Sequence, residues 1–204
     1  MHLPFPLLAA CLASGLVGAL VGRALRAFLA RLPRGTVVGA GWCEAGLGLA
    51  WAGTALAVTL GSVPPGRAPE LGALAVLAVG GTATDVLTGR LPNAITLPGA
   101  PVLLAALTPL GGGSVAHGAV GALLLGVAFA GVHLASPSAL GAGDVKLAVA
   151  LGAPLGAASW VALALAPTLA ALSLAAAAAA ARRRRLPYGP ALLGASCVVV
   201  VASA

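Results

Sequence analysis

Long apolar runs, separated by short stretches rich in glycine, proline and arginine, follow one another along nearly the whole chain. A helix needs roughly 20 mostly apolar residues to cross a bilayer, and several of the runs approach that length. The breaks divide the chain into eight apolar segments, at residues 4–22, 44–62, 69–87, 94–111, 115–135, 145–156, 157–180 and 189–204. The pattern predicts an all-α, polytopic membrane bundle with six to eight transmembrane segments, eight being the preferred number.

The sixth and seventh segments can be divided in two ways. Residues 146–180 could form one over-long helix. Two crossings are the better interpretation, because Gly152, Pro154 and Gly156 supply a break. A hairpin at this point also keeps the following arginine run on the side that Lys146 occupies.

Composition excludes an ordinary soluble domain. Hydrophobic residues make up 60% of the chain and charged residues 7%, and the mean hydropathy is +1.09, whereas about a quarter of a soluble domain is charged. The net charge of +7 could indicate nucleic-acid binding, but the cations stand in short clusters between apolar runs rather than along one solvated face. We expect this chain to contact membrane lipid and no nucleic acid.

The cations predict the orientation of the bundle. With the N-terminus outside, successive crossings place ten of the eleven cations in the cytoplasm and leave only Arg67 outside, in agreement with the positive-inside rule. The cytoplasmic set is Arg23, Arg26, Arg31, Arg34, Arg90, Lys146 and Arg182 to Arg185. Because arginines follow the first apolar run rather than precede it, this run is typical of a retained span, not of a cleaved signal peptide.

Asp85 and Asp144 are the only aspartates of the chain, and each lies within or beside an apolar segment. A carboxylate costs about 2.5–3.5 kcal/mol at the centre of a transmembrane helix and less near the interface, so both are candidate functional residues. The predicted crossings bring both to a similar depth near the cytoplasmic surface. Either each aspartate caps a helix or pairs with Arg90 or Lys146, or the two share one site.

Two carboxylates in one site cannot both ionise cheaply, so one keeps a proton while the ionised one can activate a water. This is the arrangement of an aspartic protease. Gly141 and Gly143, just before Asp144, would let a substrate backbone approach the carboxylate closely. The alternative is a flexible turn that opens a helix, with Asp144 as its cap.

Other polar residues are weaker candidates. Lys146 could bind substrate or anchor its helix at the membrane surface. Asn93 could support the loop after Asp85 or cap the fourth helix. Glu44 and Glu70 fall at the predicted starts of segments, where interaction with the helix dipole is a sufficient explanation.

Four motifs, taken with their order and membrane setting, resemble those of the GxGD-type aspartic peptidases, most closely the type IV prepilin peptidases, also called leader peptidases. The motifs are "GALVGRALRAFLARLP" at 18–33, "TGRLPNAIT" at 88–96 just after Asp85, "GAGDVKLAVALGAPLG" at 141–156 and "LPYGPALLGA" at 186–195. The resemblance covers most of the chain. It implies one peptidase domain over 1–204, with N-terminal spans at 1–63 and a core at 64–204 that carries both aspartates.

The resemblance also implies that Asp85 and Asp144 are the catalytic pair. The substrate would be the short, basic leader of a pilin-like or pseudopilin-like precursor, cut just before its apolar helix. Cleavage would take place at the cytoplasmic face of the bacterial cytoplasmic membrane, in pilus assembly or protein secretion.

One departure from the family concerns the loop after the first Arg-Leu-Pro. Many bacterial members carry paired C-x-x-C motifs there, associated with zinc, and also methylate the new N-terminus with S-adenosylmethionine. Here the loop is reduced to "RGTVVGAGW" at 34–42, followed by Cys43 alone. We therefore expect no metal site and neither zinc nor S-adenosylmethionine as a cofactor.

Two other classes of function compete with the peptidase. A small transporter or channel could use the aspartates to relay protons or bind a cation, and it would be favoured by internal repeats or further buried ionisable residues. A catalytically silent subunit of a pilus or secretion system is the other alternative.

Overall fold

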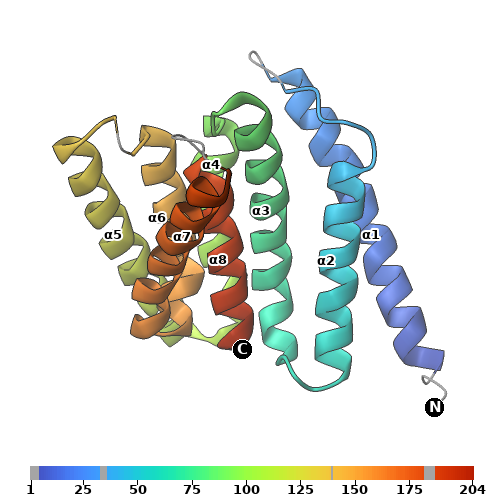
Figure 1. The fold of residues 1–204 in the computed structure, drawn as a ribbon. Helices are drawn as coiled ribbons and strands as arrows, with labels where there is room; N and C mark the ends of the chain where they lie inside the picture. The colour runs from blue at the N-terminus through green and yellow to red at the C-terminus, as the bar shows by residue number, and fades with distance from the viewer. Residues whose placement is uncertain (1–4, 33–35, 139, 182–186) are drawn as a thin grey trace.

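The computed structural model describes residues 5–32, 36–138, 140–181 and 187–204, which form α-helices, two short 3-10 helices and no strand. Figure 1 shows the helices as one bundle. They are α1 (Phe5–Arg31), α2 (Trp42–Thr59), α3 (Ala68–Thr88), α4 (Asn93–Ala106), α5 (Gly112–Ala135), α6 (Ala142–Ala158), α7 (Trp160–Ala181) and α8 (Tyr188–Ala202). Each predicted apolar segment corresponds to one of them, so the all-α polytopic fold is confirmed.

Length and apolar composition select five parts of the described chain as able to cross a membrane. They are Leu7–Arg31, Pro65–Thr88, Asn93–Leu110, Gly112–Ala135 and Trp160–Ala180. α8 is apolar but only 15 residues long, and α6 has 17 residues. The chain is thus a helical membrane protein, although not all of the eight expected segments are long and apolar enough to cross on these criteria alone.

The first helix is longer than its apolar segment. We expected it to end near residue 22, but α1 continues to Arg31. Arginine is a good helix former, so Arg23 and Arg26 end the apolar stretch without ending the helix. Arg26 also forms an ion pair with Glu44 of α2, with 2.7 Å between its Nε and the Glu44 Oε1, which joins the two helices at their charged ends.

The predicted break at Gly152, Pro154 and Gly156 is wrong. All three lie buried inside α6, and the chain turns only at Ser159, whose hydroxyl accepts a hydrogen bond from the Ala162 N–H at 2.9 Å. The glycines pack α6 tightly against α5. A Cβ at Gly156 would lie 2.7 Å from the Gly121 Cα, so small residues here serve helix contact and not a turn.

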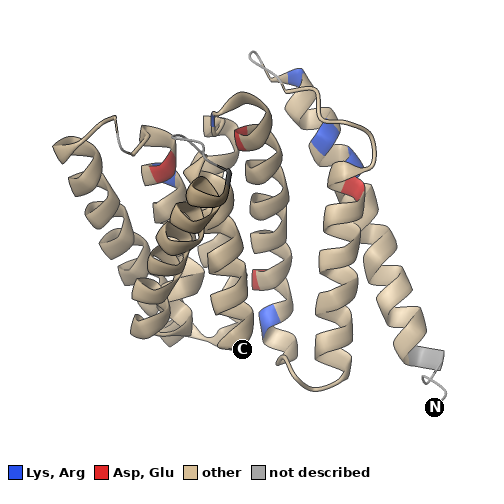
Figure 2. Ribbon diagram, in the orientation of Figure 1, with Lys and Arg blue, Asp and Glu red and all other residues tan. Residues whose placement is uncertain are grey.

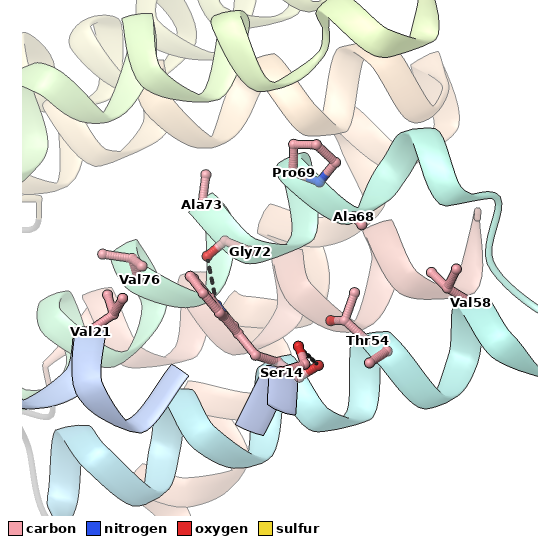
Figure 3. A pocket seen from close by; sticks show the side chains of 11 residues that line it. Ser14, Val21, Thr54, Val58, Ala68, Pro69, Gly72, Ala73 and Val76 are labelled. Carbon is pink, nitrogen blue, oxygen red and sulfur yellow. Dashed lines mark hydrogen bonds between the residues drawn. The ribbon is translucent and has the colours of Figure 1, made fainter. Parts of the chain in front are cut away.

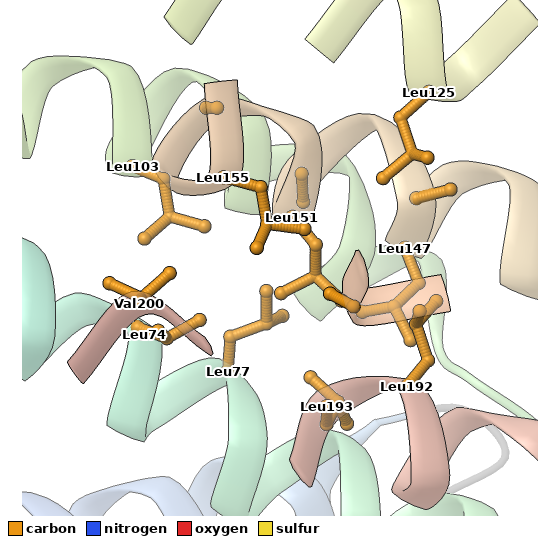
Figure 4. Close-up of a cluster of buried hydrophobic side chains, with 14 of the residues drawn as sticks. Leu74, Leu77, Leu103, Leu125, Leu147, Leu151, Leu155, Leu192, Leu193 and Val200 are labelled. Carbon is orange, nitrogen blue, oxygen red and sulfur yellow. The ribbon is translucent and has the colours of Figure 1, made fainter. Parts of the chain in front are cut away.

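Four helices surround the main apolar core. Figure 4 shows the buried leucines that point into it, among them Leu77 of α3, Leu103 of α4, Leu151 of α6 and Leu192 of α8. α3 packs against α8, and α6 packs against α4, α5 and α8. This packing fixes the C-terminal end of α3, the start of α6 and the start of α8 at the same end of the bundle (Figure 1).

Charged residues divide between the two ends of the bundle (Figure 2). The end where α3 finishes and α6 begins carries Arg90 and Lys146, whereas Arg67 precedes the opposite end of α3. This asymmetry agrees with the predicted distribution of cations. Arg34 and Arg182 to Arg185 lie outside the described residues.

Glu70 is more deeply buried than the sequence suggested. Its side chain is 0% exposed, and its Oε2 lies 3.8 Å from Nη1 of Arg67, whose side chain is 13% exposed. Among the described atoms, neither carboxylate oxygen of Glu70 has a hydrogen-bond partner. Favourable interaction with the helix dipole alone is therefore not a sufficient account of Glu70. Glu44 fits its prediction better, because its second oxygen accepts the Gly41 N–H at 3.1 Å at the start of α2.

Candidate active site

Asp85 lies near the C-terminal end of α3, facing the interior, with 7% of its surface exposed. The helix ends four residues later at Gly89, whose φ of 62° lies in the left-handed region that glycine adopts easily. The Gly89 N–H donates to the Asp85 backbone carbonyl at 2.8 Å. Thr88 adds a side-chain hydrogen bond to the Thr84 carbonyl at 2.7 Å. The end of the helix, and with it the position of Asp85, is therefore well defined.

Asp144 lies in the first turn of α6. Its Oδ2 accepts the N–H of Gly141 at 3.2 Å, as in the carboxylate half of a capping box. The predicted alternative, that Asp144 is the N-cap residue, is wrong in position, because Gly141 is the N-cap and Asp144 bonds back to its N–H from three residues into the helix. This bond uses one carboxylate oxygen, so capping is compatible with a second role.

The structure places the two aspartates at the same end of the bundle. They lie on α3 and α6, each of which packs against α8. The two ion pairs of the described residues are Arg26–Glu44 and Arg67–Glu70. Within that part of the chain, neither aspartate is paired with Arg90 or Lys146, which was the main structural alternative for a single carboxylate.

The start of α8 is the third element of the site. A Cβ at Gly189 would lie 2.6 Å from Oδ2 of Asp85. The neighbouring Tyr188 is close enough to Asp144 to interact with its charge, and its hydroxyl donates to the Pro167 carbonyl at 3.4 Å. Both residues belong to the motif at 186–195, but the sequence alone gave neither of them a role.

Leu91 fills the space between the starts of α6 and α8. A Cβ at Gly143 would lie 3.3 Å from the Leu91 Cβ, and a Cβ at Gly189 would lie 3.5 Å from the Leu91 Cδ1. Gly143 therefore has a close contact within the protein itself, in addition to any approach of substrate. Gly141 holds Asp144 through its N–H, as described above.

Lys146 and Asn93 are joined directly. The Lys146 Nζ donates to the Asn93 Oδ1 at 2.7 Å, which links α6 to the start of α4. Asn93 is the first residue of α4, and the preceding Pro92 occupies the cap position without a side-chain bond. The alternative that Asn93 caps the fourth helix is therefore wrong, and its contact with Lys146 ties the loop after Asp85 to the helix of Asp144.

Residues 71–202 match the family model of the type IV leader peptidase family. The chain belongs to this family. The match runs from α3 to α8 and includes both aspartates, Asn93, Lys146 and the start of α8. No curated protein and no solved structure matches the chain. The resemblance stated from the motifs is confirmed, and the family makes the protein a membrane protease of the leader-peptidase kind.

A hollow of about 590 Å³ with a mixed polar and apolar lining lies at the end of the bundle that carries the aspartates. It is formed by the residues after α1 and by the loop between α3 and α4, and its lining includes Thr36, Thr88, Arg90, Leu91 and Asn93. Leu91, which lines the hollow, also lies against the starts of α6 and α8, so the hollow is at the aspartate end of the bundle. It has the size and polarity to receive a short peptide segment.

A second hollow, of about 570 Å³, lies between α1, α2 and α3 and is almost entirely apolar (Figure 3). On its wall the Trp51 Nε1 donates to the Gly72 carbonyl at 3.3 Å, and the Ser14 hydroxyl donates to the Trp51 carbonyl at 3.0 Å. None of its lining residues titrates near neutral pH. It therefore offers no acid or base for peptide hydrolysis, and the aspartate site remains the candidate centre.

The described residues contain no group of three or more His, Cys, Asp or Glu side chains arranged to hold a metal ion. Cys43, the cysteine closest to the shortened loop, is fully buried in α2. A closed structural zinc site needs four ligands. The expectation that this protein uses neither zinc nor S-adenosylmethionine stays a prediction.

Proposed function

We propose that the protein is an aspartic endopeptidase in which Asp85 and Asp144 share one proton and activate one water. The observation that carries the proposal is the position of the only two aspartates at the same end of the bundle, on helices that both pack against α8, in a chain of the leader-peptidase family. Repulsion between two close carboxylates favours the state with one proton between them. Such a pair holds an acid and a base at once.

The reaction follows from that state. The ionised carboxylate takes a proton from water while the water oxygen attacks the scissile carbonyl carbon. The protonated carboxyl gives its proton to the carbonyl oxygen, and a tetrahedral intermediate forms. The intermediate then breaks the C–N bond, the amine leaves with a proton, and the pair returns to its singly protonated state. The products are a carboxylic acid and an amine, as hydrolysis requires.

The proposed substrate is a pilin-like or pseudopilin-like precursor with a short basic leader before an apolar helix. An apolar helix that lies in the membrane beside this bundle would present its leader junction at the level of a helix end. The aspartates lie at such an end, which also carries the hollow lined by Arg90 and Asn93. Family membership supports a substrate of this kind.

The proposed location is the bacterial cytoplasmic membrane, with the aspartates towards the cytoplasm. Support comes from the cations, because Arg90 and Lys146 share the aspartate end and Arg67 lies at the other. Positive charge is retained on the cytoplasmic side of membrane proteins.

The proposal is tested by co-expressing the protein with pilin-like precursors and measuring the mass of the product. We expect loss of the leader with no added methyl group, and cleavage that is unchanged by a metal chelator. An intact precursor would contradict the peptidase and favour a silent subunit. A product that carries one methyl group because of this protein would contradict the absence of transferase activity.

A further inference from the structure

Gly189 of α8 lies directly against the carboxylate of Asp85. A side chain at Gly189 would place its Cβ 2.6 Å from Oδ2 and 3.3 Å from Cγ of Asp85. Real Cβ atoms do not approach other atoms to 2.6 Å, so Asp85 occupies the volume that any other residue at this position would fill. The carboxylate thus rests directly on the backbone of α8.

The backbone at this point suits a carboxylate. Gly189 is the second residue of α8, after Tyr188, and the first N–H groups of a helix have no partner within the helix. The Asp85 carboxylate lies against the Gly189 backbone, where it can interact with this N–H. The next residue is Pro190, which has no N–H, so it offers no competing donor beside that of Gly189.

The distances from Gly189 to Leu91 and to Asp85 show which side chain would have to move if a methyl group were added at Gly189. The new methyl would lie 3.5 Å from the Leu91 Cδ1, an ordinary van der Waals distance, but would overlap the Asp85 oxygen. Leu91 therefore need not move to accommodate the methyl group, whereas the Asp85 carboxylate must. The fold can absorb the change by rotating the Asp85 side chain away from α8.

We propose that Gly189 is a positioning residue: its missing side chain and its N–H seat the Asp85 carboxylate against the start of α8, in the orientation that faces Asp144. The inference rests on the proposed catalytic pair. The start of α8 lies near both aspartates, because Gly189 is against Asp85 and the neighbouring Tyr188 is within range of the Asp144 charge. Displacement of one carboxylate from this seat would separate the acid from the base.

The kinetic test uses Gly189→Ala with two matched glycine variants. Gly194→Ala lies on the same helix with no atom within 4 Å of its Cβ, and Gly81→Ala crowds the same α3–α8 interface against the Leu193 side chain at 2.9 Å. We expect Gly189→Ala to lower kcat about 100-fold, the effect of a misplacement of about 1 Å, with a smaller change in KM. Gly194→Ala should keep the wild-type rate.

The pH profile separates positioning from crowding. The added methyl group displaces the Asp85 carboxylate from the Gly189 N–H, an interaction that favours the charged carboxylate, so the acidic limb of kcat/KM should move to higher pH in Gly189→Ala. Gly81→Ala should leave the limb in place. An unchanged rate and profile in Gly189→Ala, or an equal shift in Gly81→Ala, would overturn the inference.

A stability cycle tests the same contact without activity. Gly189→Ala should lower the melting temperature in detergent, and the loss should disappear in an Asp85→Ala background, where the overlapping carboxylate is gone. An equal loss in both backgrounds would overturn the inference. Failure of the proposed function is recognised separately, in the cleavage assay. If Asp85→Asn and Asp144→Asn cleave precursor at the wild-type rate, the proposed catalytic pair is wrong.

Discussion

At the scale of single residues, the aspartates differ in how the chain holds them. Asp85 is buried at the end of α3 and faces the backbone of α8, whereas Asp144 binds the N–H that precedes its own helix. An amide resembles a carboxyl group in shape but can neither remove a proton from water nor return one to a carbonyl. The chemistry of the pair can therefore be removed with little change in volume.

We predict that Asp85→Asn and Asp144→Asn each reduce precursor cleavage by at least about 10²–10⁴-fold, the contribution of a positioned acid or base. Glu44→Gln is the control, because Glu44 lies at the same end of the bundle but pairs with Arg26. Cleavage is followed by mass measurement, and insertion by membrane fractionation. Wild-type cleavage by either aspartate variant would disprove the catalytic pair.

At the scale of helices, glycines decide which pairs approach closely. α5 and α6 meet at Gly121 and Gly156, where a Cβ on Gly156 would lie 2.7 Å from the Gly121 Cα and 2.7 Å from the His117 carbonyl oxygen. Both are backbone atoms, which cannot rotate aside as a side chain can. In a membrane, such packing replaces the hydrophobic effect as the force between helices.

Gly156→Ala should therefore push α5 and α6 apart and destabilise the fold by about 1–3 kcal/mol, the usual cost of overpacking. Gly131→Ala on α5 is the control, because no atom lies within 4 Å of its Cβ. Thermal or denaturant unfolding in detergent measures the difference. Equal stability of the two variants would mean that the helices separate at no cost.

At the scale of the whole molecule, the two ends of the bundle carry different kinds of charge. The aspartate end holds Arg90 and Lys146, neither of which forms an ion pair with another described residue, and the other end holds the buried pair of Arg67 and Glu70. Glu70 and Asp85 are fifteen positions apart, which corresponds to about 22 Å of α-helix. The buried glutamate is therefore remote from the aspartates and has its own cation in Arg67.

Removing one member of that pair leaves the other buried without compensation. Glu70→Leu should destabilise the protein by about 3–5 kcal/mol, and the double variant Glu70→Leu with Arg67→Met should recover most of the loss. Unfolding in detergent gives both values. If the double variant is no more stable than Glu70→Leu alone, the unpaired charge of Arg67 is not the cause of the destabilisation.

The orientation of the bundle can be tested with reporters. A fusion near Arg90 and one near Pro137 should both report the cytoplasm, since each follows a helix that ends on the aspartate side, and a fusion near Arg67 should report the outside. A reporter activity that places Arg90 and Pro137 on opposite faces would separate the two aspartates and contradict the shared site.

The sequence by itself predicted the eight helical segments, because apolar length is a local property that the bilayer requires of each segment. It also predicted the peptidase family and singled out the two aspartates, since their rarity and their motifs are visible in the chain. It predicted six to eight crossings, whereas five parts of the described chain meet the criteria of length and apolar composition. It also ended the first helix near residue 22 rather than at Arg31.

Only the tertiary structure decided what lies between helices. Gly152 and Gly156 look like a break in sequence, but they pack against α5, whose residues lie about thirty positions earlier in the chain. Burial of Glu70 depends in the same way on neighbours that its own helix does not contain. Gly189 shows the reason most clearly, because its role depends on a carboxylate 104 residues away, and a glycine in a sequence does not reveal which group will occupy the volume that it leaves free.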